Sequence, residues 1–81
     1  MNLEIRLFAG LTCDNPDLPC FGQREFLLEV PSPLTIRQLR DLLGINPSVP
    51  LLTMVNSHHE HDEWLLKDND RVGMFPPIGG G

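Results

Sequence analysis

Residues 34–44 read Leu-Thr-Ile-Arg-Gln-Leu-Arg-Asp-Leu-Leu-Gly, and this stretch carries the start and stop signals of a short helix. The Thr35 hydroxyl can accept a bond from the Gln38 amide while the Gln38 side chain reaches back, which is the pattern of a capping box. Apolar residues follow at helical spacing, and Gly44 suits the left-handed position after a helix. A helix of about two turns is not stable alone, so it must pack on a sheet.

Alternating apolar residues on both sides of the helix predict the strands of that sheet. Residues 2–8 and 24–30 each alternate, and together they predict an antiparallel hairpin. The segment between them, residues 10–22, has the Asp, Asn, Pro and Gly composition of a long irregular loop. After the helix, residues 51–55 and 71–75 predict two further strands.

The segment between those last two strands carries weaker signals. Residues 56–59 read as a turn, and residues 68–70 as a tight turn in which Asn tolerates a positive φ. Residues 60–67 predict a short helical or extended piece anchored by Trp64 and Leu65. The element order is therefore β-β-α-β-(short)-β, which predicts an α+β fold with a mixed sheet of four to five strands packed on one helix.

Size and charge limit the classes of function. A chain of 81 residues and 9.1 kDa holds one domain, expected over residues 1–75 and followed by a tail over residues 76–81. The formal net charge is −5 and no basic cluster occurs, so nucleic acid is not an expected partner. The acidic residues crowd into residues 60–70, as a solvated face or a contact for a basic partner. Neither a bilayer-spanning stretch nor a signal pattern is present, so we expect a cytoplasmic protein without a membrane partner.

Two groups of side chains raise alternatives that involve metal or redox chemistry. Cys13 and Cys20 are too few for a disulfide scaffold; they could approach each other across the loop, but free thiols are expected in a reducing cytosol. His58, His59 and His61 are zinc-type ligands, and the two cysteines could in principle complete a site. The cysteine spacing is wider than in common zinc motifs, so we predict a solvated turn and no metal.

The glycines are unevenly placed, because three of the seven are Gly79, Gly80 and Gly81. Six extended residues, from Pro76 onward, can project about 20 Å from a sheet. Glycines lack a Cβ and can thread a narrow channel in a partner, while Pro76 and Pro77 stiffen the base of the thread. Gly81 would present a carboxylate at the tip. The alternative is a frayed terminus or a cloning remnant.

Two phenylalanines lie beside the tail in the predicted sheet. Phe75 has the opposite strand parity from its inward-facing neighbours Val72 and Met74, and Phe8 has the opposite parity from the apolar residues of the first strand. Both rings would then lie on the outer face and form a docking patch for a partner. The alternative is that alternation breaks at strand ends and both rings belong to the core.

Five motifs run almost end to end along the chain: Ile5-Arg6-Leu7-Phe8-Ala9, Thr35-Ile36-Arg37-Gln38-Leu39, Val55-Asn56, Leu66-Lys67-Asp68-Asn69-Asp70-Arg71-Val72 and Phe75-Pro76-Pro77-Ile78-Gly79-Gly80-Gly81. Their order resembles the ubiquitin-like sulfur-carrier family, which includes the small subunit of molybdopterin synthase and the thiamine-pathway sulfur carrier. The resemblance implies a β-grasp fold and a protein co-substrate that is not itself an enzyme.

The resemblance also implies a chemistry for the tail. In that family an adenylating enzyme uses ATP and Mg²⁺ to activate the terminal glycine, and sulfur then replaces the adenylate to give a thiocarboxylate. Gly81 would be the residue modified, with no cofactor bound to the carrier itself. The remaining tail and docking residues would contact partners: Gly80, Gly79, Ile78, Pro77, Pro76, Phe75 and Phe8.

Different features of the sequence favour different branches of the family. Pro76-Pro77 is typical of molybdopterin synthase small subunits, whereas the short stretch over residues 44–55 resembles the thiamine-type carrier. The loop from Cys13 to Cys20 fits neither pattern, and Asn69 replaces the usual turn glycine. The tail reaches the active site, so we expect a role in molybdenum or tungsten cofactor synthesis, with the molybdopterin synthase large subunit as sulfur acceptor. The alternatives are a thiamine carrier acting on thiazole synthase, a ubiquitin-like protein modifier, and a β-grasp interaction module with an incidental tail.

Overall fold

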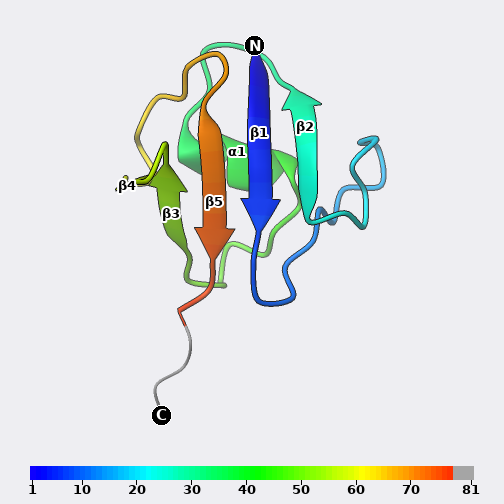
Figure 1. Cartoon of the computed structure of the whole chain (residues 1–81). Coiled ribbons are helices and arrows are strands. Elements are labelled where there is room, and N and C mark those ends of the chain that lie inside the picture. The colour runs from blue at the N-terminus through cyan, green and yellow to red at the C-terminus, as the bar shows by residue number, and fades with distance from the viewer. Residues whose placement is uncertain (78–81) are drawn as a thin grey trace.

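Five strands and one helix make up the computed structural model, which describes residues 1–77. In chain order they are β1 (Asn2–Leu7), β2 (Glu25–Glu29), α1 (Ile36–Leu42), β3 (Leu52–Val55), β4 (His58–His59) and β5 (Arg71–Phe75). The strands form one sheet in the order β2-β1-β5-β3-β4, and α1 lies across one of its faces (Figure 1). β1 and β5 are parallel and the other pairs are antiparallel, so the sheet is mixed, as the sequence predicts.

The core lies between the sheet and α1. Leu3, Ile5 and Leu7 of β1 are each at most 3% exposed, because the alternation of the strand turns all three toward the helix. On the helix, Ile36 and Leu39 are fully buried at the spacing that puts them on one face. Each such side chain stabilises the fold by about 1.5–3 kcal/mol relative to an exposed one.

The ends of α1 are fixed by local bonds of the predicted kind. Thr35 Oγ1 accepts a bond from the Gln38 amide at 3.2 Å, and Gln38 Oε1 accepts one from the Thr35 amide at 2.9 Å, which completes the capping box. Gly44 has a φ of +74°, and a Cβ there would lie 2.9 Å from the Asp14 carbonyl group. Glycine is therefore required by both conformation and space.

The prediction of a turn over residues 56–59 is right for its first two residues and wrong for the last two. His58 and His59 are not part of a turn; they form β4, which pairs with β3, and the turn itself is only Asn56-Ser57. Both turn residues have positive φ, 51° and 72°, as a tight two-residue hairpin requires. The turn lacks glycine, which is the usual sequence signal for such a hairpin, so β4 was not predicted.

The connection from β4 to β5 is anchored differently from the prediction. Leu66 is the buried residue, at 5% exposed, whereas Trp64 and Leu65 remain 39% and 55% exposed. The connection is irregular, with Leu65 bridged to Thr35 beside the start of α1. Asn69 has a φ of +69°, which matches the predicted tight turn.

The predicted tail is described only at its base. Pro76 and Pro77 follow β5 outside any strand, whereas Ile78, Gly79, Gly80 and Gly81 lie outside the described residues. Over the described part of the chain, no helix has the length and apolar character needed to cross a membrane.

Candidate functional site

The central strand β5 leads directly into the glycine-rich segment. β5 lies between β1 and β3, and it runs parallel to β1, so both strands end at the same edge of the sheet. Figure 1 shows the chain leaving the sheet at this edge, through Pro76 and Pro77. Neither proline has an amide hydrogen for the ladder, so the strand ends after Phe75. Because β5 is paired on both sides, the position of its last residue is fixed, and so is the place where the following segment begins.

Two aromatic rings lie at that edge, on the face of the sheet opposite α1. The rings of Phe8 and Phe75 are edge to face, with centroids 5.7 Å apart and an interplanar angle of 79°. Phe8 is 44% exposed, and Phe75 is half-buried. This is the outer-face position that strand parity predicts for both residues, and the alternative in which both belong to the core does not hold.

The absence of a side chain at Gly73 leaves room for the Phe8 ring. A Cβ at Gly73 would lie 3.4 Å from Phe8 Cε2, so the ring rests close to the bare backbone of β5. Arg6 pairs with Gly73 across the parallel ladder, which puts this glycine on the outer face too. Sequence reasoning identified the two phenylalanines but not the glycine, because its role depends on the register between β1 and β5.

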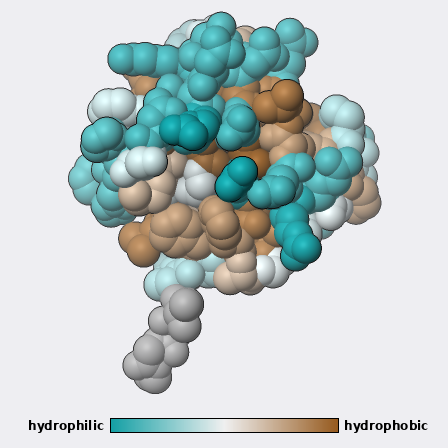
Figure 2. Space-filling view, in the orientation of Figure 1, coloured by the Kyte–Doolittle hydropathy of each residue, from teal (hydrophilic) through white to brown (hydrophobic). Residues whose placement is uncertain are grey.

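Neighbouring apolar residues of β3 extend this surface. Leu52 is opposite Phe75 and Met54 is opposite Gly73 in the antiparallel ladder, so these side chains share the outer face. We define the outer patch as five residues: Phe8, Leu52, Met54, Gly73 and Phe75. Figure 2 shows hydrophobic residues gathered on this face toward the edge where β5 ends. The alternation of side chains along β3 is the sequence signal that could have placed Leu52 and Met54 on the outer face.

A shallow hollow of about 340 Å³ lies over the patch. It is lined by Phe8, Met54, Gly73 and Phe75 of the patch and by the charged residues Glu4, Arg6 and Arg71. Arg6 is also 3.3 Å from Glu25 in an exposed ion pair. An apolar centre with a polar rim is the usual organisation of a protein–protein interface. An aromatic pair at the centre adds the residue type that contributes most to binding energy.

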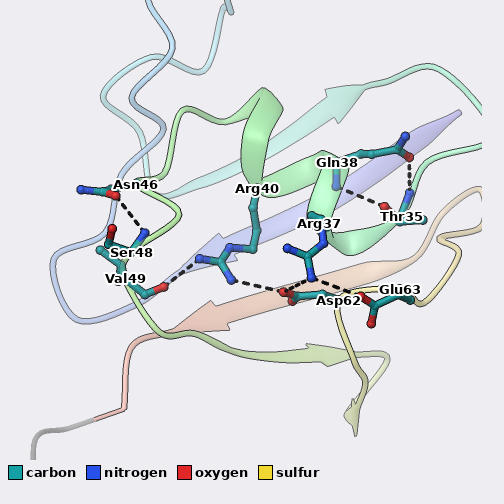
Figure 3. Close-up of polar contacts among 9 residues, drawn as sticks. All are labelled: Thr35, Arg37, Gln38, Arg40, Asn46, Ser48, Val49, Asp62 and Glu63. Carbon is teal, nitrogen blue, oxygen red and sulfur yellow. Dashed lines mark hydrogen bonds and ion pairs between the residues drawn. The ribbon is translucent and has the colours of Figure 1, made fainter.

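Two carboxylates of the acidic segment, which is predicted as a solvated face or a contact for a basic partner, pair with arginines of α1, and the Glu63 side chain stays 77% exposed. Asp62 lies 3.6 Å from both Arg37 Nη2 and Arg40 Nη1, and Glu63 lies 3.1 Å from Arg37 Nη2 (Figure 3). The Arg37 guanidinium, mainly through its hydrogen bond, holds the pKa of Glu63 below its usual value. These carboxylates therefore stabilise the contact between the helix and the β4–β5 connection.

Asp68 and Asp70, two further acids of that segment, also have local partners. Asp68 Oδ1 accepts a bond from the Asn2 amide at 2.7 Å, and Asp70 Oδ2 accepts one from the Lys67 amide at 2.8 Å. Asn56 Nδ2 donates to Asp70 Oδ1 at 2.9 Å. Turns and ion pairs within the domain therefore account for four of the five acids: Asp62, Glu63, Asp68 and Asp70.

The histidine cluster lies on the far edge of the sheet from β2. His58 and His59 are exposed on β4, and the rings of His59 and His61 are 6.0 Å apart. Within residues 1–77, no three His, Cys, Asp or Glu side chains gather in a way that could hold a metal ion. Cys13 and Cys20 are buried together at a distance from this cluster along the chain, as free thiols.

A mixed five-stranded sheet with one short helix packed against it is the β-grasp fold of ubiquitin-like proteins. The ThiS family model matches residues 17–81, and the chain belongs to the ThiS family. Both the family and the β-grasp fold agree with the prediction from the sequence. No curated protein sequence matches the chain.

Solved structures of similar fold come from archaea and bacteria. SAMP1 from Haloferax volcanii is 18% identical with a TM-score of 0.69, and each chain is covered completely. A putative molybdopterin converting factor subunit 1 from Pyrococcus furiosus is 22% identical with a TM-score of 0.63, over 96% of this chain and 99% of that one. A complex of subunits 1 and 2 of molybdopterin-converting factor from Helicobacter pylori gives 21% identity and a TM-score of 0.60, over the full length of both chains. At these identities the likeness shows a shared fold.

Proposed function

We propose that this chain is a sulfur carrier whose Gly81 carboxylate is adenylated and then converted to a thiocarboxylate, for use in molybdopterin synthesis. The observation that carries the proposal is the course of β5. This strand is paired on both sides, ends beside the exposed ring pair, and continues into Pro-Pro-Ile-Gly-Gly-Gly. A partner that grips the outer patch would therefore receive the tail at a fixed place.

The chemistry needs two partners and no catalytic side chain from the carrier. A carboxylate is a poor electrophile, so the adenylating enzyme would join Gly81 to AMP from ATP, with Mg²⁺, and release pyrophosphate. A sulfur nucleophile would then displace AMP and leave sulfur on the terminal carbonyl. Gly79 and Gly80 have no side chains to obstruct a narrow active-site channel. The same slim thread would next enter the acceptor enzyme.

The test of carrier function is a mass measurement on the full chain. The protein is incubated with its adenylating enzyme, ATP, Mg²⁺ and a sulfur donor, and the intact mass is recorded. We expect the mass gain for replacement of one oxygen by sulfur, and no gain without ATP. A variant lacking both Gly80 and Gly81, which no longer ends in Gly-Gly, is the matched control and should stay unmodified. Equal modification of both proteins, or none of the full chain, would refute the proposal.

The acceptor separates the two branches of the proposal. Pro76-Pro77 and the similar fold of two molybdopterin-converting factor subunits favour the large subunit of molybdopterin synthase. The ThiS family match favours thiazole synthase as a second candidate. Purified thiocarboxylate protein is offered to each acceptor with its substrate. We expect the original mass to return only with the molybdopterin synthase subunit. Return of the mass with thiazole synthase alone would assign the chain to the thiamine branch.

A further inference from the structure

The two cysteines lie together inside the loop that joins β1 to β2. Cys13 is 0% exposed and Cys20 is 3% exposed. Their Sγ atoms are 3.0 Å apart, and both are free thiols. This is closer than the roughly 3.5–4.0 Å at which even non-bonded carbon atoms attract best. Neither the ThiS fold nor the outer patch uses this pair.

Backbone bonds on both sides hold the two residues in place. The Cys13 amide donates to the Gln23 carbonyl at 2.9 Å, and the Gly22 amide donates back to the Cys13 carbonyl at 2.8 Å. The Gln23 amide in turn donates to the Cys20 carbonyl at 2.8 Å. These bonds close a small ladder, so the approach of the sulfur atoms follows from the course of the main chain.

The same loop is attached to the end of α1. The Asp14 amide donates to the Leu43 carbonyl at 2.8 Å, and Asn15 Nδ2 donates to the Leu42 carbonyl, also at 2.8 Å. Gly44 leaves the space that the Asp14 carbonyl occupies. The thiol pair therefore stands at the junction of the loop, the helix end and the core.

Two other roles explain the pair less well. A metal site needs further ligands, and in residues 1–77 no third metal-binding side chain joins the two thiols. Simple apolar packing accounts for the burial of both side chains, because free cysteine behaves as a small apolar residue. Packing alone does not bring the two sulfur atoms into direct contact; the Cys20 thiol donates a hydrogen bond to Cys13 Sγ at 3.0 Å, which puts the two thiols next to each other in the reduced chain.

We propose that Cys13 and Cys20 are a modification site, where a small-molecule disulfide such as oxidised glutathione converts the two thiols into one intramolecular disulfide. One cysteine, as thiolate, attacks a sulfur of the small disulfide and releases one small thiol. The second cysteine then attacks the mixed disulfide and releases the other small thiol. The chain loses two protons and two electrons, and the small disulfide gains them as it becomes two thiols. A further approach of about 1 Å brings the sulfur atoms to bonding distance.

Burial controls the rate of this exchange. Desolvation, together with the neighbouring Cys13 thiol, raises the pKa of Cys20 to about 12. The thiolate is the attacking form, so very little of it exists near neutral pH while the loop is closed. Exchange then proceeds through opening of the loop, and the product, once formed, closes a ring of eight residues, 13–20.

The test uses the full chain in glutathione buffers of increasing oxidised fraction. After acid quenching and alkylation under denaturing conditions, the intact mass counts the free thiols. We expect a monomer that has lost two hydrogens and takes up no alkylating reagent. Its melting temperature should be higher than that of the reduced chain by roughly 10 °C, from closure of this ring. Comparison of the two redox forms of one sequence requires no substitution that could disturb folding.

Variants and local measurements give the controls. Cys20→Ala should stop at the glutathione adduct of Cys13, and its melting temperature should not rise in the oxidised buffer, because no ring can close. In the oxidised native chain, hydrogen exchange of the Gly22 and Gln23 amides should slow at least about 10-fold, because the loop opens less often. A glutathione adduct or a disulfide-linked dimer as the main product of the native chain would overturn the proposal. So would an oxidised form that melts no higher than the reduced one.

Discussion

At the scale of single residues, the outer patch depends on one aromatic contact. Phe75 lies edge to face with Phe8, directly before the Pro-Pro base of the tail. We predict that Phe75→Ala weakens binding of the adenylating enzyme about 10-fold or more, because aromatic residues at an interface centre commonly contribute 2 kcal/mol. Titration calorimetry measures the affinity. The domain should stay folded, because Phe75 is only half-buried.

Leu27 provides the matched control for this prediction. Its side chain is 75% exposed on the same face of the sheet, but on the edge strand β2, opposite Glu4. Leu27→Ala removes similar exposed apolar area away from the patch and should leave the affinity unchanged. Equal weakening by both substitutions would show that the sheet face binds without a centre at Phe75. Unfolding of Phe75→Ala would show a core role instead.

Arg40 is a buried cation whose partners come from two different segments. It is 9% exposed; Nη2 donates to the Val49 carbonyl at 2.7 Å, and Nη1 lies 3.6 Å from Asp62 (Figure 3). We predict that Arg40→Met lowers the free energy of unfolding by about 2–3 kcal/mol, because a buried carbonyl and a carboxylate lose their partner. Urea denaturation followed by circular dichroism measures the loss.

A substitution at Arg37 is the control that distinguishes the effect of burial from the effect of charge. It contacts the same Asp62, but its side chain is 61% exposed. Arg37→Met should therefore cost less than about 1 kcal/mol, as exposed ion pairs do. A larger loss for Arg37 than for Arg40 would show that charge pairing with the acidic segment, and not burial, stabilises this side of the helix.

At the scale of elements, α1 was predictable because its signals are local. Thr35 and Gln38 form bonds over three residues, and Gly44 ends the helix with a positive φ. β4 was not predictable, because it depends on Ser57 adopting a φ of 72°, a conformation that serine rarely takes. The position of Leu66 in the core likewise depends on how the connection meets α1, and hydrophobicity alone favoured Trp64.

The capping box gives a prediction for the helix as an element. Thr35→Ala removes the acceptor of the Gln38 amide bond, and we expect a loss of about 1 kcal/mol in the free energy of unfolding. Thr35→Ser keeps the hydroxyl and should retain most of that stability. Thermal and urea denaturation of the three proteins measure both differences. Identical losses for alanine and serine would mean that the Thr35 methyl group, and not its hydroxyl, stabilises the helix start.

At the scale of the whole molecule, the sequence predicts a chemistry for the tail, whereas the surface beside the tail becomes visible only in the folded structure. The terminal glycines are contiguous, so their composition alone predicts a threading tail. The outer patch is assembled from β1, β3 and β5, and residues such as Gly73 enter it through strand register. The contact of Cys13 with Cys20 likewise depends on main-chain bonds within a loop that has no periodic pattern.

The last prediction concerns the separate roles of the domain and the tail. The described hydrophobic core extends from Leu3 to Met74, so a chain truncated after Pro77 should keep its stability within about 0.5 kcal/mol. It should also bind the adenylating enzyme through the outer patch yet form no thiocarboxylate. Truncation after Gly73, which removes the fully buried Met74, should unfold the domain. Urea denaturation, calorimetry and intact mass measure the three properties. A loss of 2 kcal/mol or more after Pro77 would mean that the tail packs on the domain, which contradicts a thread that is free to enter two partners.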